Sequence, residues 1–316
     1  MENKNLDQLD NLMLSYSSII GPEEYNAIMT DEHLYIDIAD RYIKKTITEK
    51  SKDNRLQVVE LGCGPARVLR VMVDINNIDL TAVDIDPVFC DYTKKIIHKK
   101  NPNVDIICSD IGDYKPTSLV DIFYSQGFHH HVAKGPETQK YLTNIYNNLK
   151  EGGCYILSDE FVPHYTDNND RNTKLVIWYS HIIAHALRNS YNFLATEEAK
   201  TLLDDLQEGA EDKGIKSQEQ LNLVLSYVEK IDVAAKSDNM SQSEEYAENF
   251  LNDLSQLFSI NIESLEKEMY LSRRDYKICD KVLRQEVEQV GFIIEKCKSF
   301  GPIDNIGGMS VYILRK

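Results

Sequence analysis

The chain has 316 residues and a mass of 36.3 kDa, with 42% hydrophobic and 27% charged residues, the balance of an ordinary folded protein. Its formal net charge is -16, and a surface this acidic repels phosphate backbones and anionic lipids, so we expect neither nucleic acid nor membrane as a partner. No apolar run approaches the roughly 18–20 residues of a membrane helix, and the polar N-terminus does not look like a signal peptide. We therefore expect a cytoplasmic protein.

The cysteines predict neither disulfides nor a metal site. None of the six forms a C-x-x-C pair, and their spacings match no zinc motif. Several lie in apolar runs, where cysteine usually behaves as a small buried hydrophobe. We expect all six to be reduced and structural, with Cys63 in a loop near a cofactor.

The first 50 residues are expected to be helical, because apolar side chains recur at helical spacing on both sides of a break at Gly21-Pro22. From Leu56 onward, short apolar runs of strand length alternate with helical stretches. This alternation predicts a parallel sheet with helices on both faces. The expected strands are residues 56–61, 80–84, 104–108, 120–124 and 154–158, and a helix is expected at 137–149.

The alternation stops near Phe161, and residues from about 165 to 270 show helical periodicity with almost no strand signal. It then returns, with a helix from about 274 to 290 that Gly291 ends. Two final strands are expected at residues 292–298 and 309–314.

These patterns divide the chain into three parts. We expect a helical lid over residues 1–50, an α/β domain formed by residues 51–164 and 271–316, and a helical insertion over residues 165–270. The insertion is expected to cover the substrate and can also form a homodimer interface.

The strongest local signal is the run V-V-E-L-G-C-G-P-A-R-V-L at residues 58–69, which has the strand, glycine turn and helix order of a nucleotide-type cofactor site. Gly62 and Gly64 let the backbone turn sharply and let a ligand approach the main chain. Asp84 ends the next strand, where a carboxylate can accept hydrogen bonds from both ribose hydroxyls. Asp110 follows the third strand, where an adenine edge would lie.

The run E-L-G-C-G-P-A at residues 60–66 resembles motif I of the class I S-adenosylmethionine-dependent methyltransferases, with Ala66 in the place of the third glycine. Four further runs resemble later motifs of that family in the same order. They are residues 83–86 (ribose), 109–111 (adenine), 121–130 (beside the methyl group) and 149–153 (the turn before the fifth strand).

The resemblance covers residues of about 55–160 and 275–316, and it implies a Rossmann-like, seven-stranded, mostly parallel sheet whose last strand is antiparallel. It implies S-adenosyl-L-methionine (SAM) as the cofactor and an S-adenosylmethionine-dependent methyltransferase (EC 2.1.1.-) as the activity. The cofactor-binding residues expected from the motifs are Glu60, Gly62, Cys63, Gly64, Asp84, Ile85, Asp110, Ile111, Ser125 and Gln126.

A dinucleotide dehydrogenase is the rival interpretation of the glycine run. Its G-x-G-x-x-G fingerprint is incomplete here, because Arg67 stands where the third glycine belongs. Glu60, before the first glycine, would also suit a pyrophosphate poorly, whereas it suits the cationic methionine end of SAM.

Methyl transfer is an in-line displacement at a sulfonium carbon, so catalysis consists of positioning and, where the nucleophile carries a proton, its removal. The catalytic candidates follow the fourth and fifth strands. His129 or His130 is a candidate general base, and Asp159 is a candidate to orient the acceptor. The alternative is that these side chains cap a turn or face solvent, and no spacing requires a divalent metal.

We expect a methyltransferase that acts on an O, N or C nucleophile of a small molecule, such as a secondary metabolite, beneath a helical lid that excludes water. Three alternatives stay open: a SAM-binding enzyme that transfers no methyl group, such as a cyclase; a protein methyltransferase; and a regulatory module that senses the cofactor.

Overall fold

The computed structural model describes residues 17, 20–26, 34–132, 136–167, 170–171, 174, 276–303 and 307–316, together with scattered positions between 222 and 253. The predicted insertion at 165–270 lies mostly outside these residues. Among the described helices, none combines the length and the apolar character that a membrane crossing requires.

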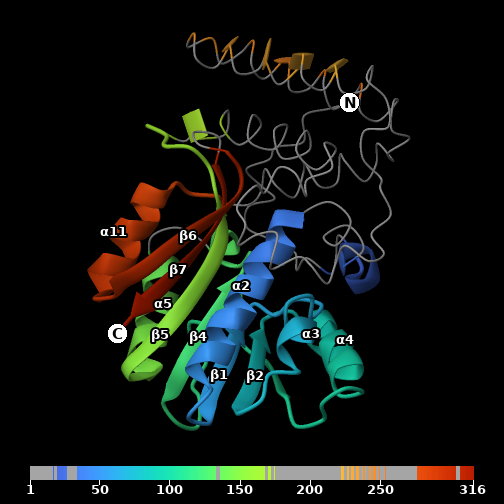
Figure 1. Ribbon diagram of the computed structural model, residues 1–316, viewed down its shortest axis with the longest axis vertical. Helices are drawn as coiled ribbons and strands as arrows, with labels where there is room; N and C mark the ends of the chain where they lie inside the picture. The colour runs from blue at the N-terminus through green and yellow to red at the C-terminus, as the bar shows by residue number, and fades with distance from the viewer. Residues whose placement is uncertain are drawn as a thin grey trace.

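The described residues form a seven-stranded sheet in the order β3-β2-β1-β4-β5-β7-β6 (Figure 1). Strands β1 to β5 run parallel, whereas β7 is antiparallel to both β5 and β6. This confirms the predicted fold class, including the antiparallel last strand. The strands are β1 (Leu56–Leu61), β2 (Ile78–Asp84), β3 (Asp105–Cys108), β4 (Val120–Gln126), β5 (Leu149–Phe161), β6 (Ile293–Ile303) and β7 (Gly307–Arg315).

Helices cover the sheet and bury its apolar side chains. Val59 and Leu61 of β1 belong to one core cluster with Leu142 and Leu283, which come from two adjacent helices, α5 and α11. Burying each such side chain contributes about 1.5–3 kcal/mol to folding. The helices are α2 (Leu34–Lys50), α3 (Leu69–Met72), α4 (Pro87–Ile97), α5 (Pro136–Asn148) and α11 (Asp280–Val290), with a 3-10 turn, η3, at His129–His131.

α2 lies across the sheet, where it packs against β4, β6 and β7 (Figure 1). Its apolar stripe is buried, including Ile36, Ile43 and Ile47. The C-terminal part of the predicted 1–50 segment is therefore a layer of the α/β sandwich.

Most predicted starts lie within two residues of the observed ones, but the starts of β5 and α11 were wrong by five residues or more, and long-range pairing explains both. β5 begins at Leu149 instead of 154, because Leu149 pairs with Val120 ahead of a register shift. α11 begins at Asp280 instead of about 274, since residues 276–279 are not helical and bond to other loops: Tyr276 N donates to His130 O and Val162 N to Ile278 O. The end of α11 at Gly291, with φ 108, is as predicted.

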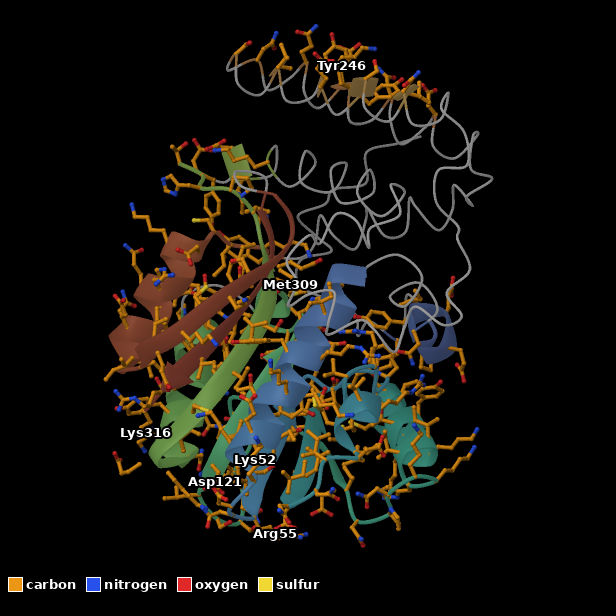
Figure 2. All side chains as sticks on the ribbon, in the orientation of Figure 1. Lys52, Arg55, Asp121, Tyr246, Met309 and Lys316 are labelled. Carbon is orange, nitrogen blue, oxygen red and sulfur yellow. The ribbon has the colours of Figure 1, made fainter. Side chains whose placement is uncertain are left out.

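The two ends of the sheet differ. Figure 2 shows Lys52, Arg55, Asp121 and Lys316 at the lower end, where the parallel strands begin, and Met309 nearer the upper end. Since β1 to β5 run parallel, their carboxyl ends share the upper edge, where the predicted site residues lie.

Candidate cofactor and catalytic site

The site is centred on the ends of β1 and β4, which are neighbours in the sheet although they are not consecutive in the chain. From β1 the chain continues to β2 and β3 on one side and then crosses to β4 on the other, which makes this a topological switch point. The loops after β1 and β4 touch, because a Cβ built on Gly62 would lie 2.4 Å from Cδ2 of Phe128. The predicted cofactor loop, residues 62–66, and the loop that leads into η3 (the histidine turn, His129–His131) are therefore direct neighbours.

The glycine loop is held in left-handed backbone conformations. Gly62 has φ +66° and Gly64 has φ +47°, which glycine adopts without a steric penalty. Ala66, in the third glycine position, also has a positive φ of 65°, and this conformation costs an L-residue about 1–2 kcal/mol. Ala66 thus adopts the left-handed backbone conformation that the two glycines of the loop also have.

The backbone of Gly64 is open to a ligand. A Cβ built on Gly64 meets no atom within 4 Å, in contrast to the crowded Gly62. The loop itself is fixed, since Gly62 N donates to Val83 O at 2.8 Å and Thr93 Oγ1 donates to Gly64 O at 2.8 Å. A rigid loop with exposed main chain suits close approach by a cofactor.

Asp84 joins the glycine loop to the end of β2. One carboxylate oxygen accepts from Gly64 N and the other from Asp86 N, each at 2.8 Å. Burial raises the pKa of Asp84, and these two backbone hydrogen bonds oppose the rise. A carboxylate accepts about four hydrogen bonds, so Asp84 has capacity for two ribose hydroxyls.

The next predicted residues line the same edge toward β3. Ile85 is 57% exposed, an unusual value for an isoleucine beside a buried acid, and it offers an apolar surface to a flat ring. Asp110 is exposed and accepts from Gly112 N at 2.6 Å, whereas Ile111 is buried in the core cluster. Ile85 and Asp110 are therefore available to a nucleoside, whereas Ile111 is a core residue.

Glu60 is 2% exposed and accepts a hydrogen bond from Tyr124 Oη at 2.9 Å. Burial, the largest cause, raises the pKa of Glu60 to about 8 despite that hydrogen bond. Glu60 is therefore an acid that a nearby cation would ionise. Cys63, which follows the first glycine, is also buried, at 4% exposed.

Ser125 and Gln126 point to opposite sides of β4. Ser125 is fully buried and its Oγ lies 2.6 Å from Tyr155 Oη, inside the core. Gln126 accepts from Arg67, which also pairs with Asp40 of α2. Neither Arg67 nor Asp40 was predicted as a site residue, and the only sequence signal for them was an arginine inside motif I.

His130 and Asp159 form a buried pair across the ends of β4 and β5. Asp159 Oδ1 lies 2.5 Å from His130 Nδ1, and Asp159 Oδ2 accepts from His130 N at 3.1 Å. Burial alone would raise the pKa of Asp159, but the charge and hydrogen bond of His130, with help from His129 and Lys277, lower it to about 2. Asp159 is thus a carboxylate at neutral pH, and Nδ1 of His130 carries the proton donated to it.

His129 is held differently. Its Nδ1 contacts Tyr141 Oη of α5, and its Nε2 lies 3.1 Å from Glu286 of α11. Both ring nitrogens thus face the helical layer. The structure therefore brings one of the two candidate histidines, His130, together with Asp159.

A second buried pair adjoins this one. Lys277, from the segment just before α11, is 3% exposed and donates to Glu160, the residue after Asp159. Arg171 lies nearby, with its guanidinium 4.0 Å from the centre of the Tyr276 ring and Nη1 3.5 Å from Lys277 O. No local sequence pattern indicated Lys277 or Arg171.

The N-terminal segment contacts the cofactor loops. Asn26 Nδ2 donates to Pro65 O at 2.9 Å, and Ser17 N donates to Asp86 Oδ2 at 3.1 Å. The Tyr25 ring lies 6.0 Å from that of Phe89. These contacts bring Ser17 and residues 20–26 against the glycine loop and the start of α4.

Residues 58–153 match the profile of a protein family described as a methyltransferase domain. The match runs from β1 into β5 and includes the glycine loop, Asp84 and the histidine turn. This segment is thus similar to methyltransferase domains, in agreement with the class I motifs and the SAM cofactor that the sequence predicted. A comparison with curated proteins finds no match.

Solved structures resemble the chain loosely. A candidate exported protein from Bordetella parapertussis has 12% identity and a TM-score of 0.45, over 87% of this chain and 66% of its own. The mitomycin 7-O-methyltransferase MmcR has 10% identity and a TM-score of 0.48, over 93% and 57%. A TehB-like SAM-dependent methyltransferase from Corynebacterium glutamicum has 10% identity and a TM-score of 0.41, over 88% and 87%. The chain thus spans less than two thirds of the first two, and none of the three fixes an acceptor.

Gly64→Ala should weaken SAM binding about tenfold or more, because a new methyl group would occupy the open space over the loop, at a cost of about 1–3 kcal/mol. Gly152→Ala is the matched control, since Gly152 also has a positive φ and open surroundings but lies near the start of β5, at the other end of the sheet. Calorimetry with SAM should separate the two variants, while both lose similar stability. Equal affinities would contradict the assignment of the loop.

Glu60 should make stability fall as pH rises. The folded protein holds the Glu60 proton up to about pH 8, whereas the unfolded chain releases it near 4.5, so between these values stability drops by up to about 1.4 kcal/mol per pH unit. Urea unfolding at pH 5 to 8 should show this slope in the wild type and a flatter one in Glu60→Gln. The exposed Glu151→Gln is the control, and an unchanged slope in Glu60→Gln would refute the interpretation.

Proposed function

We propose that the chain is a methyltransferase that transfers a methyl group from SAM to a protonated oxygen or nitrogen nucleophile of a small molecule. The observation that carries this proposal is the His130–Asp159 pair, buried beside the glycine loop at the carboxyl edge of the sheet. A SAM-binding protein that only senses its cofactor has no need of an oriented base there.

The proposed cofactor residues fit SAM chemically. Asp84 has two free acceptor positions for ribose hydroxyls, Ile85 presents an apolar surface, and the main chain at Gly64 is open. Glu60 would ionise near a methionine ammonium group. When bound, SAM supplies a methyl group on a positively charged sulfur.

The proposed base is Nε2 of His130. Asp159 accepts the Nδ1 proton, which fixes the tautomer and leaves the lone pair on Nε2, and its negative charge stabilises the imidazolium that forms when Nε2 takes a proton from the acceptor. Asp159 acts as a positioning residue, because it touches His130 and not the reacting atoms. We assign His129 a structural role between Tyr141 and Glu286.

A small acceptor agrees with the covering of the site. Asn26 bonds to the glycine loop and Ser17 to Asp86 at the start of α4, which supports the proposal that the N-terminal segment closes over the cofactor, with the 165–270 insertion completing the lid. The net charge of -16 disfavours nucleic acid as an acceptor.

Asp84→Ala should weaken SAM binding about 100-fold, because two hydrogen bonds to a charged acceptor are lost, each contributing about 1.5–3 kcal/mol, and the loop loses its anchor. Asp79→Ala is the control from the same strand, since Asp79 lies at the opposite end and bonds to Arg55 and Gln57. Equal affinity of both variants in calorimetry would contradict the proposed site.

His130→Gln should lower kcat about 100-fold or more, with little change in SAM affinity, because general-base catalysis contributes about 10²–10⁴-fold. Asp159→Asn should have a similar but smaller effect. The measurement is transfer of labelled methyl groups from SAM to a panel of phenols, hydroxamates and amines.

The controls are His129→Asn and His98→Asn. His98 is a histidine remote from the site, and its ring is also held by a hydrogen bond, with Nε2 2.9 Å from Val104 O. Full turnover by His130→Gln would exclude it as the base, and binding of SAM without transfer to any acceptor would favour a non-methylating enzyme instead.

A further inference from the structure

Two cysteines lie beneath the proposed nucleoside site. Cys108 is the last residue of β3, where it pairs in register with Asp84, and Cys90 lies in the first turn of α4. Cys90 Sγ is 3.5 Å from Asp84 O, and Cys108 Sγ is 3.6 Å from Ile85 O. Both thiols therefore donate to carbonyls of the two residues proposed to hold the ribose and the adenine.

Cys90 also lies close to the backbone that carries Cys108. Cys90 Sγ lies 3.9 Å from the carbonyl of Ile107, the residue before Cys108. The pKa of the Cys90 thiol is raised mainly by burial, and also by the nearby Asp84 and Cys108. Of the pair, Cys108 is exposed and Cys90 is buried, so a reagent reaches Cys108 first.

We propose that Cys90 and Cys108 form a reversible disulfide that lowers the affinity of the site for SAM. This inference rests on the proposed function, because it takes Asp84 and Ile85 as cofactor residues. No other pair among the six cysteines has both thiols on those two carbonyls, since the described bonds of Cys63, Cys154, Cys279 and Cys297 lie elsewhere.

The chemistry balances with a low-molecular-weight disulfide as oxidant. The Cys108 thiolate attacks oxidised glutathione, which forms a mixed disulfide and releases one glutathione thiolate. Cys90 then loses its proton and attacks Sγ of Cys108, which releases a second glutathione. The two protein thiols are oxidised, the glutathione disulfide is reduced, and excess reduced glutathione reverses both steps.

The disulfide would act on the cofactor through the main chain. It removes both S–H donors, so the carbonyls of Asp84 and Ile85 each lose a hydrogen bond, although Asp84 O keeps its bond from Ser109 N at 2.8 Å. It also pulls the start of α4 toward β3, which moves Asp86 and the turn that carries Ile85. The expected result is a loss of SAM affinity of about tenfold.

The test incubates the full chain in graded ratios of oxidised to reduced glutathione and maps cross-linked peptides by mass spectrometry after alkylation. SAM affinity is measured by calorimetry on the same samples. Cys297→Ser is the matched control, because Cys297 is also exposed but lies in β6, the opposite edge strand.

Two results together would establish the proposal. The peptide map must show a Cys90–Cys108 cross-link, and the affinity for SAM must fall on oxidation and return on reduction in the wild type and in Cys297→Ser. Cys108→Ser and Cys90→Ala must show no such change in affinity. Full glutathionylation of Cys108 without a cross-link would overturn it, as would a cross-link that leaves affinity unchanged. Reduced wild type that binds no SAM would instead contradict the proposed function, and the peptide map would still decide whether the disulfide forms.

Discussion

The site depends on one close approach, the packing of the Phe128 ring against the backbone of Gly62. It arises because β1 and β4 pair in parallel at the centre of the sheet, so that the loops after them open at the same edge. A side chain on Gly62 would push these loops apart. The cofactor loop and the histidine turn therefore behave as one unit, which puts a candidate base beside the place where a methyl donor is proposed to bind.

Charged groups near this edge are buried in pairs. Asp159 faces His130, Glu160 faces Lys277, and Asp40 faces Arg67. Removing one member of such a pair leaves an uncompensated buried charge, at a cost of about 3–5 kcal/mol. The pairs thus fix side-chain orientation before any ligand arrives, which is the condition for electrostatic preorganisation.

Much of the fold follows from local pattern. The strands from Leu56 to Asp84 and the end of α11 at Gly291 were predictable, because apolar runs and glycines report backbone conformation directly. The sequence pattern predicted a helix before Asp280, yet residues 276–279 are not helical, because Tyr276 and Ile278 bond to loops more than 100 residues away. Tertiary hydrogen bonds overrode helical propensity there.

By itself, the sequence determined that Gly62, Asp84 and the three consecutive histidines would meet, since each follows a parallel strand and the carboxyl ends of parallel strands share an edge. Only the tertiary structure decided how those side chains are oriented. His129 is held by Tyr141 and by Glu286, 157 residues away, whereas His130 is held by Asp159, and Ser125 faces Tyr155 in the core. Consecutive residues point in different directions, and which one meets an acid depends on elements that the local sequence does not contain.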